Sequence, residues 1–142
     1  SKGACELVGA KGKVAAIDIQ EMKLQGCFFL HKSIEEIHAR DFEEISEFLP
    51  FDLVLSDMAP NISGIRERDN ALMIGLVNST LSIIDNFLKI KGSVLIKVFQ
   101  GESLDYTRQA LKKRFNKVKI SKPKASRPNS REIYIIGKEL KK

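Results

Sequence analysis

The sequence has 142 residues, of which 43% are hydrophobic and 30% are charged, which is typical of one globular domain with its own core, spanning residues 1–142. The longest apolar runs are far shorter than about eighteen residues, which excludes a membrane-spanning helix, and no signal peptide is visible. Cys5 and Cys27 are the two cysteines. They suit neither a disulfide framework nor a zinc site, and they indicate a reducing compartment.

The charge is distributed unevenly along the chain. Residues 1–86 carry 8 basic and 14 acidic side chains, a net charge of −6, whereas residues 87–142 carry 16 basic and 4 acidic side chains, a net charge of +12. A one-sided positive field attracts polyanions, of which nucleic acid is the commonest, although a solvated basic surface would have the same composition. The basic residues concentrate at Lys112, Lys113, Arg114, Lys117, Lys119, Lys122, Lys124, Arg127 and Arg131.

The first half of the chain alternates short apolar runs with helical patterns. Residues 3–8 are expected to end a helix, residues 9–12 to turn, and residues 13–19 and 27–30 to form strands. Ser33-Ile34-Glu35-Glu36 has the form of a capping box, which predicts a helix from Ser33 to about residue 49. Residues 52–56 form a third strand, whose continuous apolar core suits a parallel strand covered on both faces.

The second half begins with a loop at residues 58–68. A stripe of apolar residues three and four apart then predicts a helix through Ile74, Val77, Leu81, Ile84 and Leu88. After a turn at Lys91-Gly92 we expect a strand at 93–99, a helix at 103–115, and strands at 117–120 and 132–137. This alternation predicts an α/β fold.

The last connection determines the direction of the final strand. Residues 121–131 contain Pro123 and Pro128 and no helical periodicity, whereas a parallel crossover needs a dozen or more residues and usually a helix. The last two strands should therefore be antiparallel neighbours. A reversed last strand begins where the parallel strands end, so Glu132 should lie at the same edge as Asp57 and Lys97, where open α/β sheets bind ligands.

Lys97 is the strongest single candidate for chemistry. It lies within the apolar strand Val94-Leu95-Ile96-Lys97-Val98-Phe99, where an ammonium group is costly unless it is paired or loses its proton. The structural alternative is a lysine whose stem is buried and whose charge reaches solvent. A lysine with a lowered pKa is a plausible general base.

Three acids are weaker candidates when taken singly. Asp57 follows the third strand and Glu132 opens the last one, but either could serve only a turn or a surface ion pair. Asp18 ends the first strand, where dinucleotide-type folds place an acid that binds ribose hydroxyls, and a helix cap is the alternative. His31 and His38 lack partners at metal-ligand spacing, so we expect no metal site.

Four segments of the sequence form a distinctive set of motifs. They are Ser56-Asp57-Met58-Ala59-Pro60-Asn61-Ile62-Ser63-Gly64, Lys97-Val98-Phe99-Gln100-Gly101, Ser130-Arg131-Glu132-Ile133-Tyr134, and Lys122-Pro123 followed by Ser126-Arg127. These motifs resemble those of the FtsJ/RrmJ (RlmE) family of S-adenosylmethionine (SAM)-dependent ribose 2′-O-methyltransferases of large-subunit ribosomal RNA. The resemblance implies a Rossmann-like methyltransferase fold with a mostly parallel sheet and an antiparallel last strand.

The resemblance also implies roles for individual residues. Lys97 would accept the proton of the target 2′-hydroxyl, Asp57 would orient Lys97 and border SAM, and Glu132 would hold Lys97 or the ribose. Asp18 would contact SAM. Ser33 departs from the family, which has an Asp near the adenine there, so the Ile34 backbone would make that contact. Lys112, Lys113, Lys122, Lys124, Arg127 and Arg131 are the basic residues expected to bind RNA.

The resemblance further implies that a first strand, a glycine-rich loop and a first catalytic lysine precede Ser1 in the natural protein. This chain alone should then bind SAM poorly. We expect a monomer that acts on ribosomal RNA or the large ribosomal subunit, without a membrane, in the cytoplasm or an organelle. A non-enzymatic RNA-binding or ribosome-assembly module and an mRNA cap 2′-O-methyltransferase are the alternative functions, and the target nucleotide is expected to be a uridine by family analogy.

Overall fold

The computed structural model describes residues 14–18, 27–31, 43, 49–58, 60–122 and 131–142. Its contacts divide the chain into two units, Ser1–Leu49 and Pro50–Lys142. In the first unit, β1 (Val14–Asp18) and β2 (Cys27–His31) pair in parallel, with Asp18 opposite His31. The helix end at 3–8, the turn at 9–12 and the helix from Ser33 lie outside the described residues, apart from positions 43 and 49.

The second unit is built on a four-stranded sheet with the order β3-β4-β6-β5. The strands are β3 (Phe51–Ser56), β4 (Leu88–Phe99), β5 (Phe115–Ser121) and β6 (Glu132–Leu140). β3 and β4 are parallel, whereas β6 is antiparallel to both β4 and β5. The predicted reversal of the last strand is therefore confirmed.

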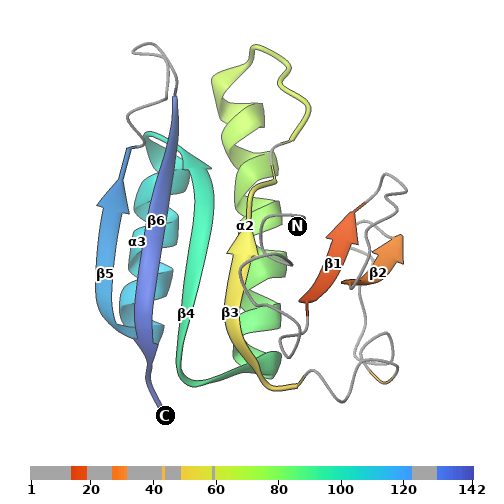
Figure 1. Cartoon of the computed structure of the whole chain (residues 1–142). Helices are drawn as coiled ribbons and strands as arrows, with labels where there is room; N and C mark the ends of the chain where they lie inside the picture. Colours follow the sequence, from red (N-terminus) through yellow and green to blue (C-terminus); the bar gives the residue numbers. More distant parts are fainter. Residues whose placement is uncertain (1–13, 19–26, 32–42, 44–48, 59, 123–130) are drawn as a thin grey trace. The chain divides into compact units, whose positions relative to one another are not determined.

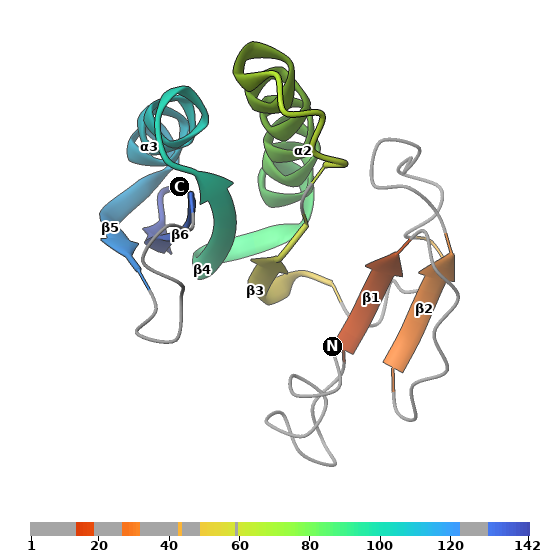
Figure 2. The same ribbon diagram turned by 90° about the horizontal axis from the view of Figure 1, so that it is seen from above.

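Two helices cover one face of this sheet (Figures 1 and 2). They are α2 (Arg66–Phe87) and α3 (Glu102–Arg114), and both contribute apolar side chains to the core. The core-facing residues alternate along the strands, with Val94, Ile96 and Val98 on β4 and Ile133 and Ile135 on β6 all buried. The helices contribute the predicted stripe, namely Val77, Leu81 and Ile84 of α2 and Leu104 and Leu111 of α3.

The predicted boundary between α2 and β4 needs a correction. Leu88 was expected to continue the helical stripe, but it caps α2 with extended backbone and is the first residue of β4, while remaining buried. The turn predicted at Lys91-Gly92 lies inside β4. Lys91 has a φ of 69°, and the register with β3 shifts between Phe51 and Leu53, so the chain bends here without leaving the sheet.

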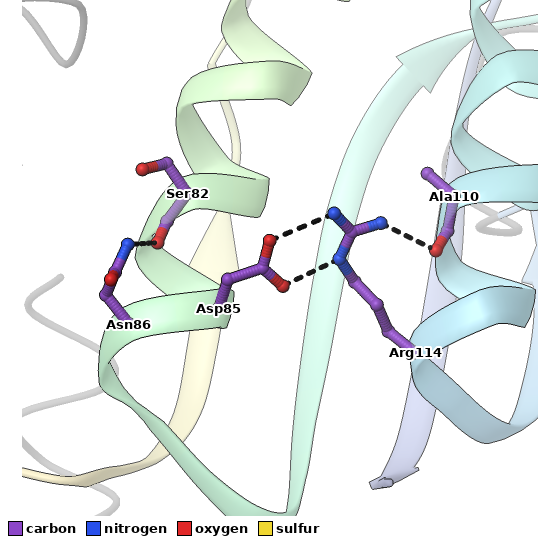
Figure 3. Close-up of polar contacts among 5 residues, drawn as sticks. All are labelled: Ser82, Asp85, Asn86, Ala110 and Arg114. Atoms are coloured by element: carbon purple, nitrogen blue, oxygen red, sulfur yellow. Dashed lines mark hydrogen bonds and ion pairs between the residues drawn. The ribbon is translucent and has the colours of Figure 1, made fainter. Parts of the chain in front are cut away.

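Polar contacts connect α2 to α3 near the carboxyl-terminal ends of both helices (Figure 3). Arg114 donates from Nε to Oδ1 of Asp85 at 2.7 Å and from Nη2 to Oδ2 at 3.0 Å, and its Nη1 donates to the carbonyl of Ala110 at 3.0 Å. The hydrogen bond to Asp85 raises the pKa of Arg114. Because both side chains are partly exposed, this two-point ion pair stabilises the helix pair by at most about 1 kcal/mol.

Among the described residues, no helix combines the length and the apolar character that crossing a membrane requires. No group of three or more metal-ligating side chains occurs in that part of the chain either.

Gly137 gives a stability prediction because its backbone lies close to the Phe115 ring. A Cβ added there would meet two atoms of the Phe115 ring at 2.9 Å and Cγ1 of Val94 at 3.0 Å. We expect Gly137→Ala to lower the free energy of unfolding by about 1–3 kcal/mol, measured by urea denaturation of the full-length protein. The double variant Gly137→Ala/Phe115→Leu should recover part of that loss. Unchanged stability of Gly137→Ala would contradict this account.

Candidate functional site

Lys97 and its two carboxylate partners lie together at the carboxyl end of β4. Nζ of Lys97 lies 3.2 Å from Oδ1 of Asp57 and 3.9 Å from Oε1 of Glu132. The Lys97 side chain is 13% exposed, whereas those of Asp57 and Glu132 are 71% and 44% exposed. The cation is therefore sheltered while both acids remain open to solvent.

The sheet topology explains why these residues meet. Asp57 follows Ser56, the last residue of β3, whose partner on β4 is Ile96, the neighbour of Lys97. β6 runs in the opposite direction, so it begins beside the end of β4, with Glu132 opposite Phe99. The strand reversal thus brings an acid from the far end of the sequence to the lysine, as expected from the sequence.

Tyr134 joins this group, although the sequence analysis assigned it no role. It lies directly opposite Lys97 on β6, and its hydroxyl donates a hydrogen bond to Oδ1 of Asp57 at 3.1 Å. Its spacing of two residues from Glu132 could have indicated this, because alternate residues of a strand share a face. Burial is the main cause that raises the pKa of Tyr134 above its usual 10.0, and the hydrogen bond to Asp57 adds to it.

A second polar cluster holds the loop that follows Asp57. The N–H and the hydroxyl of Ser63 donate to Oδ1 of Asp69 at 2.9 and 2.8 Å, and the N–H of Gly64 donates to Oδ2 at 3.2 Å. Asp69 is 1% exposed, and Gly64 has a φ of +86°, which favours glycine. These bonds, with that from the Ser63 N–H largest, lower the pKa of Asp69. Asp69 therefore fixes the loop to the first turn of α2.

Arg131 lies beside this cluster and differs from the exposed basic residues. Its Cζ lies 5.4 Å from the centroid of the Phe99 ring, and its Nε and Nη2 are buried with no hydrogen-bond partner among the described residues. Its charge contributes to the lowered pKa of Asp69, so the two groups are electrostatically coupled. The carbonyl of Arg131 accepts a hydrogen bond from the N–H of Gln100 at 2.7 Å, which joins the start of β6 to the end of β4.

The remaining predicted site residues divide into three groups. Asp18 ends β1, as predicted. Lys112, Lys113 and Lys122 are exposed, the first two on α3 and the third after β5. Ser33, Ile34, Lys124 and Arg127 lie outside the described residues.

The fold and site define an α/β protein of the Rossmann-like class, with a carboxylate–lysine–carboxylate group at the carboxyl edge of its sheet. Residues 1–140 match the family model described as FtsJ-like methyltransferase. The chain belongs to this family, which confirms the resemblance seen in the sequence.

Curated relatives agree with this assignment. The chain is 44% identical over 132 residues to ribosomal RNA large subunit methyltransferase E of Xanthomonas campestris pv. campestris, and 45% identical over 132 residues to that of Stenotrophomonas maltophilia. Each match covers 92% of this chain and 63% of the relative, so the chain spans somewhat less than two thirds of the length of these proteins.

Solved structures show the same fold. A ribosomal RNA methyltransferase of Plasmodium falciparum superposes with a TM-score of 0.79 at 25% identity, over 92% of this chain and 73% of that one. An rRNA methylase of Clostridium thermocellum has a TM-score of 0.59 at 15% identity, over 95% of this chain and 79% of that one.

The contact between Tyr134 and Asp57 can be tested by titration. The phenolate absorbance of wild type minus that of Tyr134→Phe isolates the signal of Tyr134. We expect this difference signal to titrate above pH 10.0. Asp57→Asn removes the negative charge beside the hydroxyl, so it should lower the pKa of Tyr134 while burial keeps part of the shift. A Tyr134 pKa that does not respond to Asp57→Asn would contradict the contact.

The Asp69 cluster gives a pH-dependent stability prediction. The pKa of Asp69 in the folded state lies below the ordinary value of 3.8, so its contribution is full above that value and is lost as the pH falls through the folded pKa. The difference in urea midpoint between wild type and Asp69→Asn should be constant from about pH 8 to pH 5 and should narrow below about pH 4. Ser63→Ala removes one donor to Asp69. When it is introduced into both proteins, the difference in urea midpoint that Asp69→Asn causes should be smaller at every pH. A difference that persists unchanged into acid would refute this role.

Proposed function

We propose that this protein transfers a methyl group from SAM to a ribose 2′-hydroxyl of large-subunit ribosomal RNA. The observation that carries the proposal is the position of Lys97, 3.2 Å from Asp57 and 3.9 Å from Glu132 at the edge where this fold class binds ligands. The family and the names of the curated relatives support the reaction and its substrate.

The reaction requires a proton acceptor at the hydroxyl. When the ribose oxygen takes the methyl group, the carbon–sulfur bond of SAM would break and release the neutral thioether. The hydroxyl proton would pass to Nζ of Lys97, a role that requires the amine form of that side chain and leaves it as an ammonium. Asp57 and Glu132 stabilise that ammonium where it forms, so their charges act more strongly on the transition state than on the ground state. Tyr134 fixes the Asp57 carboxylate by donating to Oδ1.

Asp57 fits the cofactor at the Lys97 edge, and residues of the first unit are proposed for it from the sequence. When bound, SAM supplies an electrophilic methyl group on a positively charged sulfur. The exposed carboxylate of Asp57 offers a complementary negative charge beside Lys97. Asp18 ends a parallel strand, as an acid that binds ribose hydroxyls does in related folds, and Ser33 and the Ile34 backbone would border the adenine by family analogy.

The basic half of the chain supports RNA as the partner. The net charge of +12 over residues 87–142 follows directly on the acidic half and supplies the sequence-independent attraction to phosphates. Lys112, Lys113, Lys122, Lys124, Arg127 and Arg131 are the basic residues proposed from sequence for this role. Such a substrate assigns the protein to the cytoplasm or to an organelle with its own ribosomes, and we propose that it acts as a monomer.

Replacement of Lys97 tests the mechanism. In the full-length protein, Lys97→Ala should lower the rate of methyl transfer to ribosomal RNA by at least about 100-fold, because the proton acceptor is lost, while leaving SAM affinity within a few-fold of wild type. Transfer of labelled methyl groups measures the first quantity, and calorimetry with SAM measures the second.

Lys91→Ala is the matched control, because Lys91 is an exposed lysine at the other end of the same strand. Turnover retained by Lys97→Ala would reject the assignment. RNA binding by a wild-type protein that transfers no methyl group would instead favour the non-enzymatic RNA-binding module.

A further inference from the structure

The sheet face that carries Lys97 continues across β6 and β5 as a group of lysines. Tyr134 is opposite both Lys97 and Ser121, Ile136 is opposite Lys119, and Lys138 is opposite Lys117. Directly opposed residues share a face of the sheet, and so do alternate residues along a strand. Lys117, Lys119 and Lys138 therefore lie on the same face as Lys97 and Tyr134.

This group, the sheet-face lysines Lys117, Lys119 and Lys138, is exposed and only partly neutralised. Nζ of Lys117 lies 3.3 Å from Oε1 of Glu139, whereas Lys119 and Lys138 have no ion-pair partner in the part of the chain that the structure describes. Asp57 and Glu132 pair with Lys97, at the other end of this face. Two residues of strand rise about 7 Å, so the lysines extend from about 7 to about 14 Å from the row of Tyr134.

The helices do not share this face. Figure 2 shows α2 and α3 together on one side of the sheet. Ile96 and Ile135 belong to the core that these helices share, and they alternate with Lys97 and Tyr134 along β4 and β6, so the Lys97 face is the opposite one. Lys112 and Lys113 belong to α3, so they lie in a different layer from the Lys97 site. The structure thus separates the basic residues that the sequence had grouped together.

We propose that the sheet-face lysines hold the phosphates of the RNA strand whose ribose enters the Lys97 site. The inference rests on the proposed function and specifies where that substrate lies. A polymer with a negative charge at every unit matches a surface on which several cations lead from the reactive group along one face. Lysines hold phosphates as point charges, so this surface positions the strand and reads no sequence.

Charge reversal on this face tests the inference in the full-length protein. The probe is a single-stranded oligouridylate of about twenty nucleotides at about 0.1 M salt. Lys119→Glu/Lys138→Glu should bind it about tenfold more weakly than wild type. The neutral variant Lys119→Gln/Lys138→Gln should lower the slope of log affinity against log salt by about 0.7 for each lysine. Lys91→Glu is the control, because Lys91 is exposed at the amino-terminal end of β4.

A variant of the α3 lysines tests whether RNA binds to the helical layer instead. Lys112→Glu/Lys113→Glu carries the same charge change on the helical layer and should weaken binding less than the sheet-face variant. Wild-type affinity of the sheet-face variant, in a protein whose melting temperature is unchanged, would overturn the inference, and so would a larger loss from the α3 variant. Methyl transfer to ribosomal RNA is measured in parallel. Absent transfer by wild type would reject the proposed function, whereas the binding comparison reports on the surface alone.

Discussion

The direction of β6 is the constraint on which the candidate site depends. Because β6 enters the sheet between β4 and β5 against their direction, its first residues lie at the end of β4, and Glu132 comes within 3.9 Å of Lys97. A parallel strand in that place would carry the same acid to the opposite end of the sheet, more than 20 Å away over about eight residues. The short, proline-containing connection before β6 is therefore as important to the site as the charged residues themselves, since it leaves no room for a crossover helix.

The differing exposure of the charged groups gives the site its chemical character. A charge at the sheltered Lys97 side chain costs solvation energy, and the two carboxylates within 4 Å of Nζ offset that cost when an ammonium forms there. The carboxylates keep much of their own hydration, so they remain able to meet a hydroxyl or a positively charged ligand from solvent. The site is thus preorganised to stabilise an ammonium formed at Nζ of Lys97, and the approach to it stays open.

Much of this arrangement could be predicted from sequence, because it follows from short-range patterns. Apolar periodicity located α2 and α3 to within a few residues, and the connection before β6 predicted the strand reversal and the shared edge of Asp57, Lys97 and Glu132. Tyr134 and Asp69 escaped prediction, because their roles depend on which acceptor or donor lies across space. Arg131 was predicted to be one more surface cation, but its stacking on Phe99 and its coupling to Asp69 depend on the tertiary structure. Leu88 was misplaced because an apolar residue at the end of a helical stripe is equally suited to begin a buried strand.

The two faces of the sheet in the second unit differ in what they contact. One face is covered by α2 and α3 and supplies the packing that keeps the strands in register, with Val94, Ile96, Ile133 and Ile135 all buried there. The other face carries Lys97 with its carboxylates at one edge and lysines along β5 and β6, so the proposed RNA contact would not involve the core residues. Because packing and the proposed recognition involve opposite sides of the same strands, the alternation of residues along β6 determines both. Ile133 and Ile135 hold the strand in place, and Glu132, Tyr134 and Lys138 face outward. A shift of one residue in the register of β6 would exchange these roles and remove the site together with the core.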